Sequence, residues 1–286
     1  MSDFQISPEL LGLIDQVALV TGGATGVGRG SALQLARAGC HVAIADINEE
    51  AGERTVQEIR ALGRKALFLR ADVRRQDEVR AMVTHVCAEL DGLDVAVNNV
   101  GNPLAFASVL DFTEEQWDAV FALDLKTTLF CSQAAAVSMI ERGVKGRIVN
   151  VGSTSGVVGA PSIAAYGAAK AGVIHLTKTL ALELAPYGIR VNCLVPGAHA
   201  TEQIQATLDS DGPMAGFLRA SAAATPLQRL GGVFETGGAA VFLASNLSSY
   251  MTGQAVISDG GISLTVNRPP VSAIRPKALA HLEGGK

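Results

Sequence analysis

The sequence is poor in charged and aromatic residues, and these shortages exclude several classes of protein. Charged residues make up 17% of the 286 residues and hydrophobic residues 48%, so the chain can bury a sizeable core and disorder is not expected. The formal net charge is −4 and no block of lysine or arginine runs along the chain. We therefore expect neither a nucleic acid nor a membrane as a partner.

Long apolar runs and paired cysteines are also missing. The sequence has no stretch of about 18 uninterrupted apolar residues for a membrane span, and its acidic start does not resemble a secretory signal. The four cysteines, Cys40, Cys87, Cys131 and Cys193, show no CxxC or CxxH spacing. Reduced thiols in a cytoplasmic protein are therefore expected, rather than disulfides or a metal site.

Short β-branched runs alternate with longer helical patterns along most of the chain. Strands are expected at 17–20, 42–45, 66–69, 95–97, 147–151 and 190–195, and helices near 31–38, 49–62, 77–90, 114–142 and 164–185. Buried strands separated by helices imply right-handed βαβ crossovers and an α/β fold with a doubly wound parallel sheet, the Rossmann arrangement. Thr113 and Gln116 fit a capping box at the start of the fourth helix.

No linker divides the chain, so a single domain over 1–286 is predicted, with its core at about 15–261. Two segments depart from the alternation. Residues 201–225 are polar and rich in small residues, which suits a mobile flap, and the proline-containing stretch 263–286 is expected to be an extension.

A glycine-rich turn follows the first expected strand and leads into a helix. It reads Thr21-Gly-Gly-Ala-Thr-Gly-Val-Gly28, so the candidate cofactor contacts are Gly22, Thr25, Gly26, Val27 and Gly28. Such a turn lets the backbone approach a pyrophosphate and directs free helix N–H groups toward it. The alternative is ordinary turn punctuation. The turn's place in a βαβ unit favours dinucleotide binding.

Asp46 ends the second expected strand, 18 residues beyond Gly28, and is followed by Ile47. A carboxylate there can accept hydrogen bonds from the adenosine ribose, with Ile47 beside it, and it would repel the extra phosphate of NADP. No basic residue follows in Ile47-Asn48 to compensate. The predicted cofactor is NAD, and the alternative is a solvated loop aspartate.

With the glycine turn and Tyr166-Gly-Ala-Ala-Lys170 identified, the chain resembles the short-chain dehydrogenase/reductase superfamily in its single-domain form. The resemblance runs from Val17 to about Gly261. It is strengthened by the order of these motifs with Asn98-Asn-Val-Gly101, Pro196-Gly197 and Asp259-Gly-Gly261. It implies an NAD(P)-dependent oxidoreductase acting on an alcohol or ketone.

The catalytic chemistry can also be argued from residue types. Tyr166 and Lys170 are four residues apart, so they share one face of a helix. A positive charge at ~4 Å, in an effective dielectric of ~20, stabilises a phenolate by about 4 kcal/mol. Tyr166 is thereby suited to general acid/base work near neutral pH. A serine-hydrolase site is not expected, because no histidine and acid partner is evident and no GxSxG elbow surrounds Ser153.

The resemblance assigns roles to further residues. Ser153, just past the fifth strand, is expected to orient the substrate oxygen beside Tyr166. The other carried-over cofactor positions are Asp72 and Val73 at the adenine, Asn99 as a backbone-positioning residue, and the main chain of His199 and the hydroxyl of Thr201 at the nicotinamide carboxamide. For Asp72 a helix cap is the alternative. The His199 side chain is expected either to hydrogen-bond substrate or to lie partly in solvent.

One position departs from the family pattern. The family usually has an asparagine seven residues after a tryptophan like Trp117, and this sequence has Asp124 there. In the family the main-chain carbonyl of that residue takes part in a proton relay from the lysine, and that role survives the change. A carboxylate near Lys170 would partly offset the positive field on Tyr166. We therefore expect an alkaline-shifted optimum.

The small or apolar residues at 102–106 and 154–158 indicate a fairly hydrophobic secondary alcohol or ketone as substrate. The helix at 164–184 is small or apolar nearly all round, which suits burial on two faces. Together with the resemblance, this predicts a homo-oligomer, a tetramer or a dimer. The alternative function is a sensor or scaffold that binds NAD without turnover. A cofactor-free relative such as a dehalogenase is disfavoured by the intact glycine turn.

Overall fold

The computed structural model describes residues 8–210 and 212–264. Its main sheet is seven-stranded and parallel, in the order β3-β2-β1-β4-β5-β6-β9. The strands are β1 (Val17–Thr21), β2 (His41–Asp46), β3 (Ala66–Arg70), β4 (Val95–Asn98), β5 (Arg147–Val151), β6 (Arg190–Pro196) and β9 (Ala255–Ser258). The strand order reverses between β1 and β4, where ligands of such sheets bind. The doubly wound α/β prediction is confirmed.

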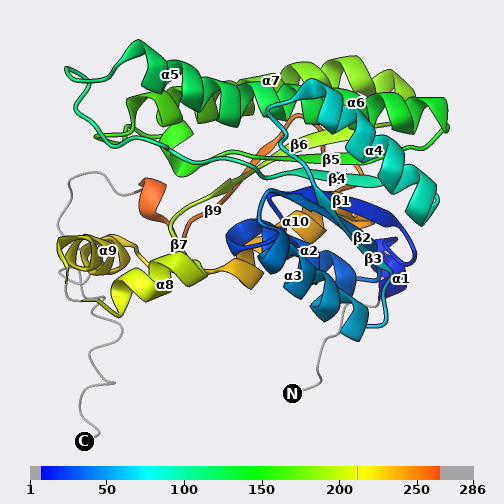
Figure 1. Cartoon of the computed structure of the whole chain (residues 1–286), viewed down its shortest axis with the longest axis horizontal. Helices are drawn as coiled ribbons and strands as arrows, with labels where there is room; N and C mark the ends of the chain where they lie inside the picture. Colours follow the sequence, from blue (N-terminus) through cyan, green and yellow to red (C-terminus); the bar gives the residue numbers. More distant parts are fainter. Residues whose placement is uncertain (1–7, 211, 265–286) are drawn as a thin grey trace, which may run out of the picture.

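Helices cover both faces of the sheet (Figure 1). One layer contains α2 (Gly26–Arg37), α3 (Glu49–Ala61) and α10 (Val233–Ala244), and the other contains α4 (Gln76–Leu90), α5 (Glu114–Phe121), α6 (Thr127–Glu141) and α7 (Ala164–Leu184). Consecutive residues of β1 serve opposite cores: Val20 packs with the α2 and α10 side and Leu19 with the α4 and α6 side. Each fully buried side chain of this size contributes about 1.5–3 kcal/mol. Apolar strands therefore hold both layers.

The expected long helix at 114–142 is interrupted. Residues Ala122–Lys126 form a π-helical turn, η1, between α5 and α6. At the start of α5, Thr113 and Gln116 form the predicted capping box, in which each side chain accepts from the other residue's backbone N–H. The stretch Glu114–Glu141 is long and apolar enough to cross a membrane by composition, yet 44% of its apolar window is buried in the protein. Cys131, Ala135 and Met139 pack in the core, so this is a core helix.

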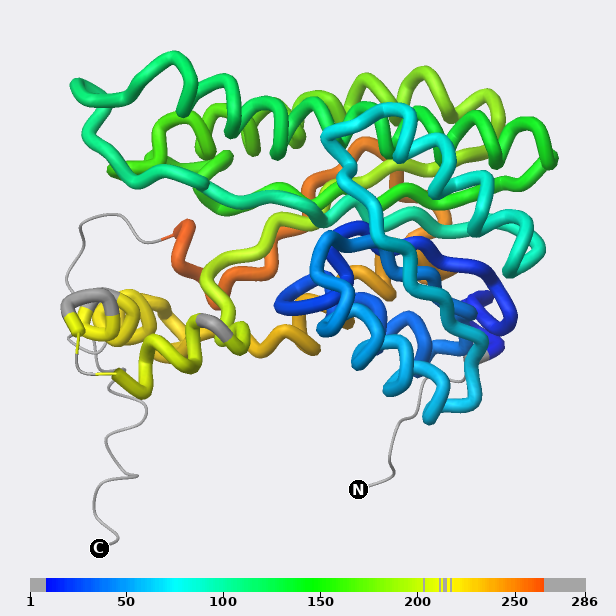
Figure 2. The backbone as a smooth tube through the Cα atoms, in the orientation of Figure 1, coloured from blue at the N-terminus to red at the C-terminus, as the bar shows by residue number. Residues whose placement is uncertain are grey.

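The remaining elements are short. They are α1 (Pro8–Leu11), η2 (Thr154–Gly156), η3 (Ala185–Tyr187), β7 (His199–Ala200), α8 (Glu202–Leu208), α9 (Pro213–Ala224), β8 (Gly231–Gly232), η4 (Asn246–Ser248) and η5 (Ile262–Leu264). The stretch predicted as a flap is thus mostly helical. Figure 2 shows α8 and α9 as the yellow segment set apart from the two main layers. Most of the predicted extension, from residue 265 onward, lies outside the described residues.

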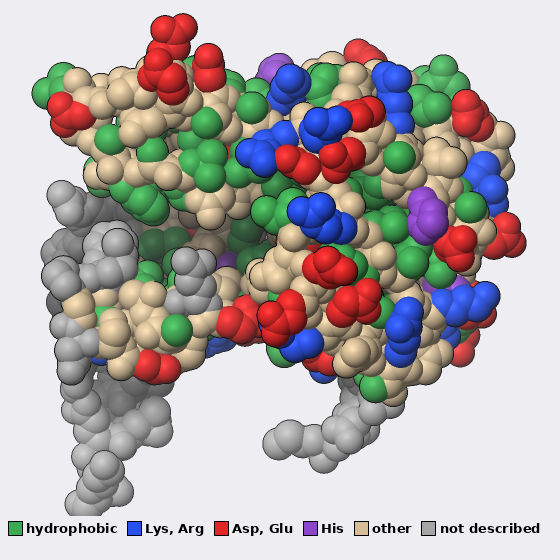
Figure 3. Space-filling model, in the orientation of Figure 1, with side chains coloured by type: hydrophobic (Ala, Val, Ile, Leu, Met, Phe, Trp, Pro, Cys, Tyr) green, Lys and Arg blue, Asp and Glu red, His purple; other side chains and the backbone are tan. Residues whose placement is uncertain are grey.

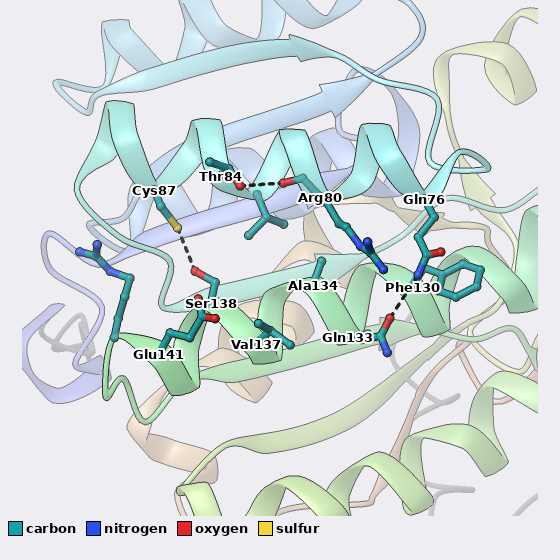
Figure 4. Close-up of a pocket in the computed structure, with 12 residues that line it drawn as sticks. Gln76, Arg80, Thr84, Cys87, Phe130, Gln133, Ala134, Val137, Ser138 and Glu141 are labelled. Atoms are coloured by element: carbon teal, nitrogen blue, oxygen red, sulfur yellow. Dashed lines mark hydrogen bonds between the residues drawn. The ribbon is translucent and has the colours of Figure 1, made fainter.

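A groove of about 640 Å³ lies between α4 and α6, on the outer side of the helical layer (Figure 4). Side chains from the two helices meet across it: Cys87 Sγ lies 3.1 Å from Ser138 Oγ, and Gln76 Nε2 donates to Gln133 Oε1 at 3.4 Å. None of the residues predicted to bind cofactor or substrate lines this groove. This groove is therefore not the predicted site.

Candidate active site

A cleft of about 690 Å³ opens at the carboxyl edge of the sheet. Figure 3 shows this side of the molecule hollowed between the upper helical layer and the α8–α9 segment. Most predicted site residues line the cleft: Gly22, Thr25, Gly26, Val27, Asp46, Ile47, Asp72, Val73, Asn99, Ser153, Tyr166, Lys170, His199 and Thr201. The other two, Gly28 and Asp124, each pack against a lining residue. The structure thus brings the predicted set together.

The glycine turn is a tight cradle between β1 and α2. A side chain at Gly28 would place its first carbon 2.0 Å from the Gly22 carbonyl oxygen, so only glycine fits there. Asn99 holds the turn from the next strand, because its Nδ2 donates to the same carbonyl at 3.0 Å. Its own N–H donates to Thr21 Oγ1 at 3.1 Å. Asn99 therefore positions the turn.

The N-terminus of α2 already holds an anion from the protein itself. The Gly26 N–H donates to Glu202 Oε2 at 3.1 Å, and Glu202 Oε1 lies 3.5 Å from Arg29 Nη1. Unpaired N–H groups and the helix dipole make this end attractive to negative charge. The contact shows that the turn accepts an oxyanion, which supports its fit to a pyrophosphate. Sequence reasoning missed Glu202, which is 176 residues away from its partner.

Asp46, at the end of β2, binds the same glycine turn, two residues before the N–H that Glu202 holds. Its carboxylate accepts from the N–H groups of Ala24 and Asn48, at 3.1 and 3.0 Å, which fixes its orientation. One basic side chain that sequence reasoning missed, Arg74, also lines the cleft. Arg74 is bound by Asp72 at 2.7 Å, and this hydrogen bond lowers the pKa of Asp72. The N-cap of α4 is Arg75, without a side-chain cap, so Asp72 does not cap this helix, contrary to the alternative considered above.

Lys170 is the most unusual side chain of the site, because it is charged and only 2% exposed. Its ammonium donates to the Val151 carbonyl at 3.1 Å and lies 5.6 Å from the centre of the Tyr166 ring. A buried cation needs such partners to offset the loss of hydration. The arrangement places a fixed positive charge beside the tyrosine, as the spacing along α7 predicts.

Asp124 supplies the remaining partner of Lys170. Its Oδ1 lies 3.2 Å from Lys170 Nζ, and its Oδ2 accepts from the Asn102 N–H at 3.4 Å. Burial raises the pKa of Asp124, while the Lys170 ammonium acts in the opposite direction. Its main-chain carbonyl accepts from Thr128 Oγ1 at 3.0 Å. The substituted carboxylate therefore binds the lysine directly, from within the π-helical turn.

Ser153 comes from the turn after β5. Its Oγ accepts from the Ser155 N–H at 3.2 Å and lies 2.8 Å from Ser155 Oγ. The turn η2 packs on α7, the helix that carries Tyr166 and Lys170. Local hydrogen bonds thus orient the Ser153 hydroxyl in the same cleft as the tyrosine.

A buried polar network supports these elements, and sequence reasoning missed it. Asn98 Nδ2 donates to Asn150 Oδ1 and to Ser132 Oγ, each at 2.9 Å. Asn150 Nδ2 in turn donates to Thr177 Oγ1 at 3.1 Å. The network ties β4, β5, α6 and α7 together beneath the cleft. Fully satisfied buried networks fix one arrangement of the elements that share them.

His199 differs from both expectations for its side chain. It is only 5% exposed, and both ring nitrogens have partners: Nδ1 lies 2.8 Å from the Gly197 carbonyl oxygen and Nε2 contacts Thr236 Oγ1. It therefore neither lies in solvent nor has a nitrogen free for substrate. Thr201 lines the cleft close by, and its hydroxyl accepts from the Ile204 N–H at 3.3 Å, which caps α8.

Comparisons with known proteins agree with this geometry. A family model described as enoyl-(acyl carrier protein) reductase matches residues 22–263. Cyclopentanol dehydrogenase of Comamonas testosteroni is 41% identical over 247 residues, or 86% of this chain and 96% of that protein. A short-chain type dehydrogenase/reductase from Mycobacterium marinum matches with a TM-score of 0.83 at 36% identity, covering 91% of this chain and 100% of the other. An NAD⁺-bound xylitol dehydrogenase matches with a TM-score of 0.80 at 32% identity, covering 87% and 99%.

Proposed function

The chain belongs to the short-chain dehydrogenase/reductase family, and from that premise we propose that it is an NAD(H)-dependent enzyme interconverting a secondary alcohol and a ketone. The observation that carries the proposal is the buried Lys170 ammonium beside Tyr166, in the cleft onto which the glycine turn opens. A protein that only binds a dinucleotide has no use for a buried charge beside a tyrosine at this edge.

In the proposed reaction the bound dinucleotide supplies the carbon that accepts or returns a hydride. The Ser153 hydroxyl orients the substrate oxygen. Tyr166 takes the alcohol proton during oxidation and returns it during ketone reduction. Lys170, held by the Val151 carbonyl, stabilises the phenolate form of Tyr166 electrostatically. Asp124, 3.2 Å from the ammonium, moderates that charge.

Several features support NAD rather than NADP. The Asp46 carboxylate is fixed at the adenosine end by two backbone N–H groups, where it suits ribose hydroxyls and repels a further phosphate. Arg74 lies nearby, but it is paired with Asp72. The similar xylitol dehydrogenase is described as NAD⁺-bound. Asp46→Asn is expected to weaken the preference for NAD⁺, measured as kcat/KM with NAD⁺ divided by kcat/KM with NADP⁺.

For the substrate we propose a hydrophobic, cyclic secondary alcohol. The cleft walls near the catalytic residues include Leu104, Leu123 and Ile204, with few charged groups. Apolar linings favour substrates that bury hydrocarbon surface. The 41%-identical relative is named for cyclopentanol, a compound of this class.

We further propose a homo-oligomer in the cytoplasm, built on α7. The exposed side of this helix carries the small or apolar Ala168, Ala171 and Leu182 together with His175 and Lys178, and Leu182 is 79% exposed. The small side chains near the start of this side and the exposed leucine near its end suit packing against a second copy. Light scattering coupled to size-exclusion chromatography of the wild type and Leu182→Glu tests this.

Turnover of cyclopentanol, monitored by the absorbance of the reduced nicotinamide, tests the main proposal. Tyr166→Phe should lower kcat/KM by about 10²–10⁴-fold, the usual range for losing a general acid/base. Its affinity for NADH, measured by fluorescence titration, should stay within about twofold. NADH binding without turnover of cyclopentanol or of a wider panel of secondary alcohols would identify the alternative, an NAD-binding sensor or scaffold. No NADH binding would exclude both.

A further inference from the structure

His199 lies in the segment between the Pro196-Gly197 pair and Thr201, which lines the cleft beside the catalytic residues. It begins β7, and pairs with Gly231 of β8 in a two-stranded sheet outside the main one. Both ring nitrogens of its side chain are occupied by protein partners. The side chain turns toward α10, a helix on the opposite layer from Tyr166.

The two hydrogen bonds of His199 define its protonation. The Gly197 carbonyl oxygen can only accept, so Nδ1 carries the proton and donates across 2.8 Å. In the neutral ring Nε2 is then an acceptor, and the Thr236 hydroxyl donates to it. Thr236 is fully buried. A neutral imidazole therefore links the Gly197 backbone to the interior of α10, with each polar atom satisfied.

Helix α10 also supports the other end of the cofactor cleft. It crosses α2 closely, because a first side-chain carbon at Gly237 would lie 2.4 Å from the Gly30 carbonyl oxygen. One at Gly30 would lie 2.3 Å from the Val233 carbonyl oxygen. The contact leaves no room for the helices to slide. The glycine turn, at the start of α2, and the segment from Gly197 to Thr201 are therefore both seated on α10.

We propose that His199 is a positioning residue for the nicotinamide end of the cofactor, acting through its bond to Thr236. The proposal rests on the function proposed above. Through its bond to Thr236, His199 holds the Gly197–Thr201 backbone at a set position relative to α10. The close packing of α10 on α2 holds the glycine turn in the same way. The imidazole thus sets the distance between the part of the protein that holds the pyrophosphate and the part that faces Tyr166.

Thr236→Val tests this with little change in shape, because valine has the size of threonine and lacks the donor. ADP-ribose, which has no nicotinamide, and NADH are the two probes. For Thr236→Val we expect NADH to bind about tenfold more weakly, the loss that one hydrogen bond of ordinary strength represents. ADP-ribose should bind within about twofold of wild type. His199→Leu should show the same pattern, and the conservative Thr236→Ser, which keeps the hydroxyl, should restore NADH binding.

A kinetic measurement separates positioning from general loosening. In Thr236→Val the deuterium isotope effect on kcat, measured with cyclopentanol deuterated at the carbinol carbon, should rise. If the nicotinamide end is misaligned, hydride transfer slows and becomes slower than product release. Equal weakening of ADP-ribose and NADH would show a structural effect only and overturn the inference, as would identical behaviour of Thr236→Val and Thr236→Ser. Wild-type protein that binds neither probe would instead overturn the proposed function.

Discussion

Asp124 Oδ1 lies 3.2 Å from Lys170 Nζ, and neither side chain is more than 2% exposed. The lysine proposed to stabilise the phenolate is therefore paired with a carboxylate that the family pattern does not place there. The pair is not isolated, since Val151 accepts from the ammonium and Asn102 donates to the carboxylate. The strength of the positive field at Tyr166 depends on this balance.

Asp124→Asn should shift the pH dependence of catalysis downward. Removing the carboxylate leaves the Lys170 charge unopposed, so the deprotonated tyrosine is favoured at lower pH. The acid-side midpoint of the kcat/KM profile should fall by roughly one pH unit, which corresponds to about 1.4 kcal/mol. Asp118→Asn, an exposed substitution on α5, is the control. A superimposable profile for Asp124→Asn would contradict the expectation.

Gly101→Ala should impair catalysis more than folding. The added carbon would lie 2.4 Å from both Asp124 Oδ1 and Lys170 Nζ, so the ion pair would have to move. Overpacking of this kind costs about 1–3 kcal/mol, and kcat should fall at least about tenfold because Lys170 leaves its position. The comparison is Gly238→Ala, where the new carbon meets nothing within 4 Å. Equal activity of the two variants would refute this.

Glu202→Gln should tighten dinucleotide binding, provided the glycine turn holds the pyrophosphate. The carboxylate occupies the Gly26 N–H that an incoming phosphate would use, and the two anions repel each other. The dissociation constant for ADP-ribose should fall about three- to tenfold, equivalent to about 0.7–1.4 kcal/mol.

The matched control is Glu58→Gln. Glu58 Oε2 also binds Arg29, at 2.6 Å, and no contact links it to the glycine turn among the described residues. Calorimetric titration of both variants separates the local contact from a general change in charge. Weaker or unchanged binding by Glu202→Gln would mean that the carboxylate does not compete with the ligand.

The free energy of unfolding should decrease as the pH falls below about 6.5, because His199 is buried in its neutral form. Burial lowers the pKa of His199, while the bond to Gly197 and the charge of Glu235 act the other way. A lowered pKa in the folded state means that the unfolded chain takes up the proton first. The contribution of neutral His199 to the free energy of unfolding is thus complete above about pH 6.5. It is lost as the pH falls through the pKa of His199 in the folded protein.

Urea unfolding at pH 7.5, 6.5 and 5.5 measures this. The free energy of unfolding of wild type should decline by up to about 1.4 kcal/mol per pH unit more steeply than that of His199→Leu. His41, whose pKa burial also lowers, is present in both proteins and cancels. Parallel curves would show that His199 is not the group that titrates.

Sequence patterns were sufficient where the signal is local. The six expected strands and the Tyr166–Lys170 spacing depend on side chains close in sequence, and the structure contains both. Strand β9 was missed because it has only four residues at the sheet's edge, with the pattern exposed, intermediate, exposed, intermediate. Helix α10 was missed because Gly237 and Gly238 interrupt its apolar pattern.

Long-range partners explain the other differences. The surroundings of His199 depend on Thr236, 37 residues later, and the anion on the glycine turn comes from Glu202, 176 residues later. No periodicity links residues so far apart. Tertiary packing brings each pair together.

The π-helical turn at Ala122–Lys126 also constrains the length of the chain. A helix advances about 100° per residue, so the extra residue that such a turn accommodates rotates everything after it by that amount. Before the turn, Val120 faces α7, whereas after it Cys131 and Met139 face the sheet. Deleting one residue here would swing α6 away from the strands it covers. We therefore expect a one-residue deletion in this helix to be far more disruptive than a substitution at an exposed position.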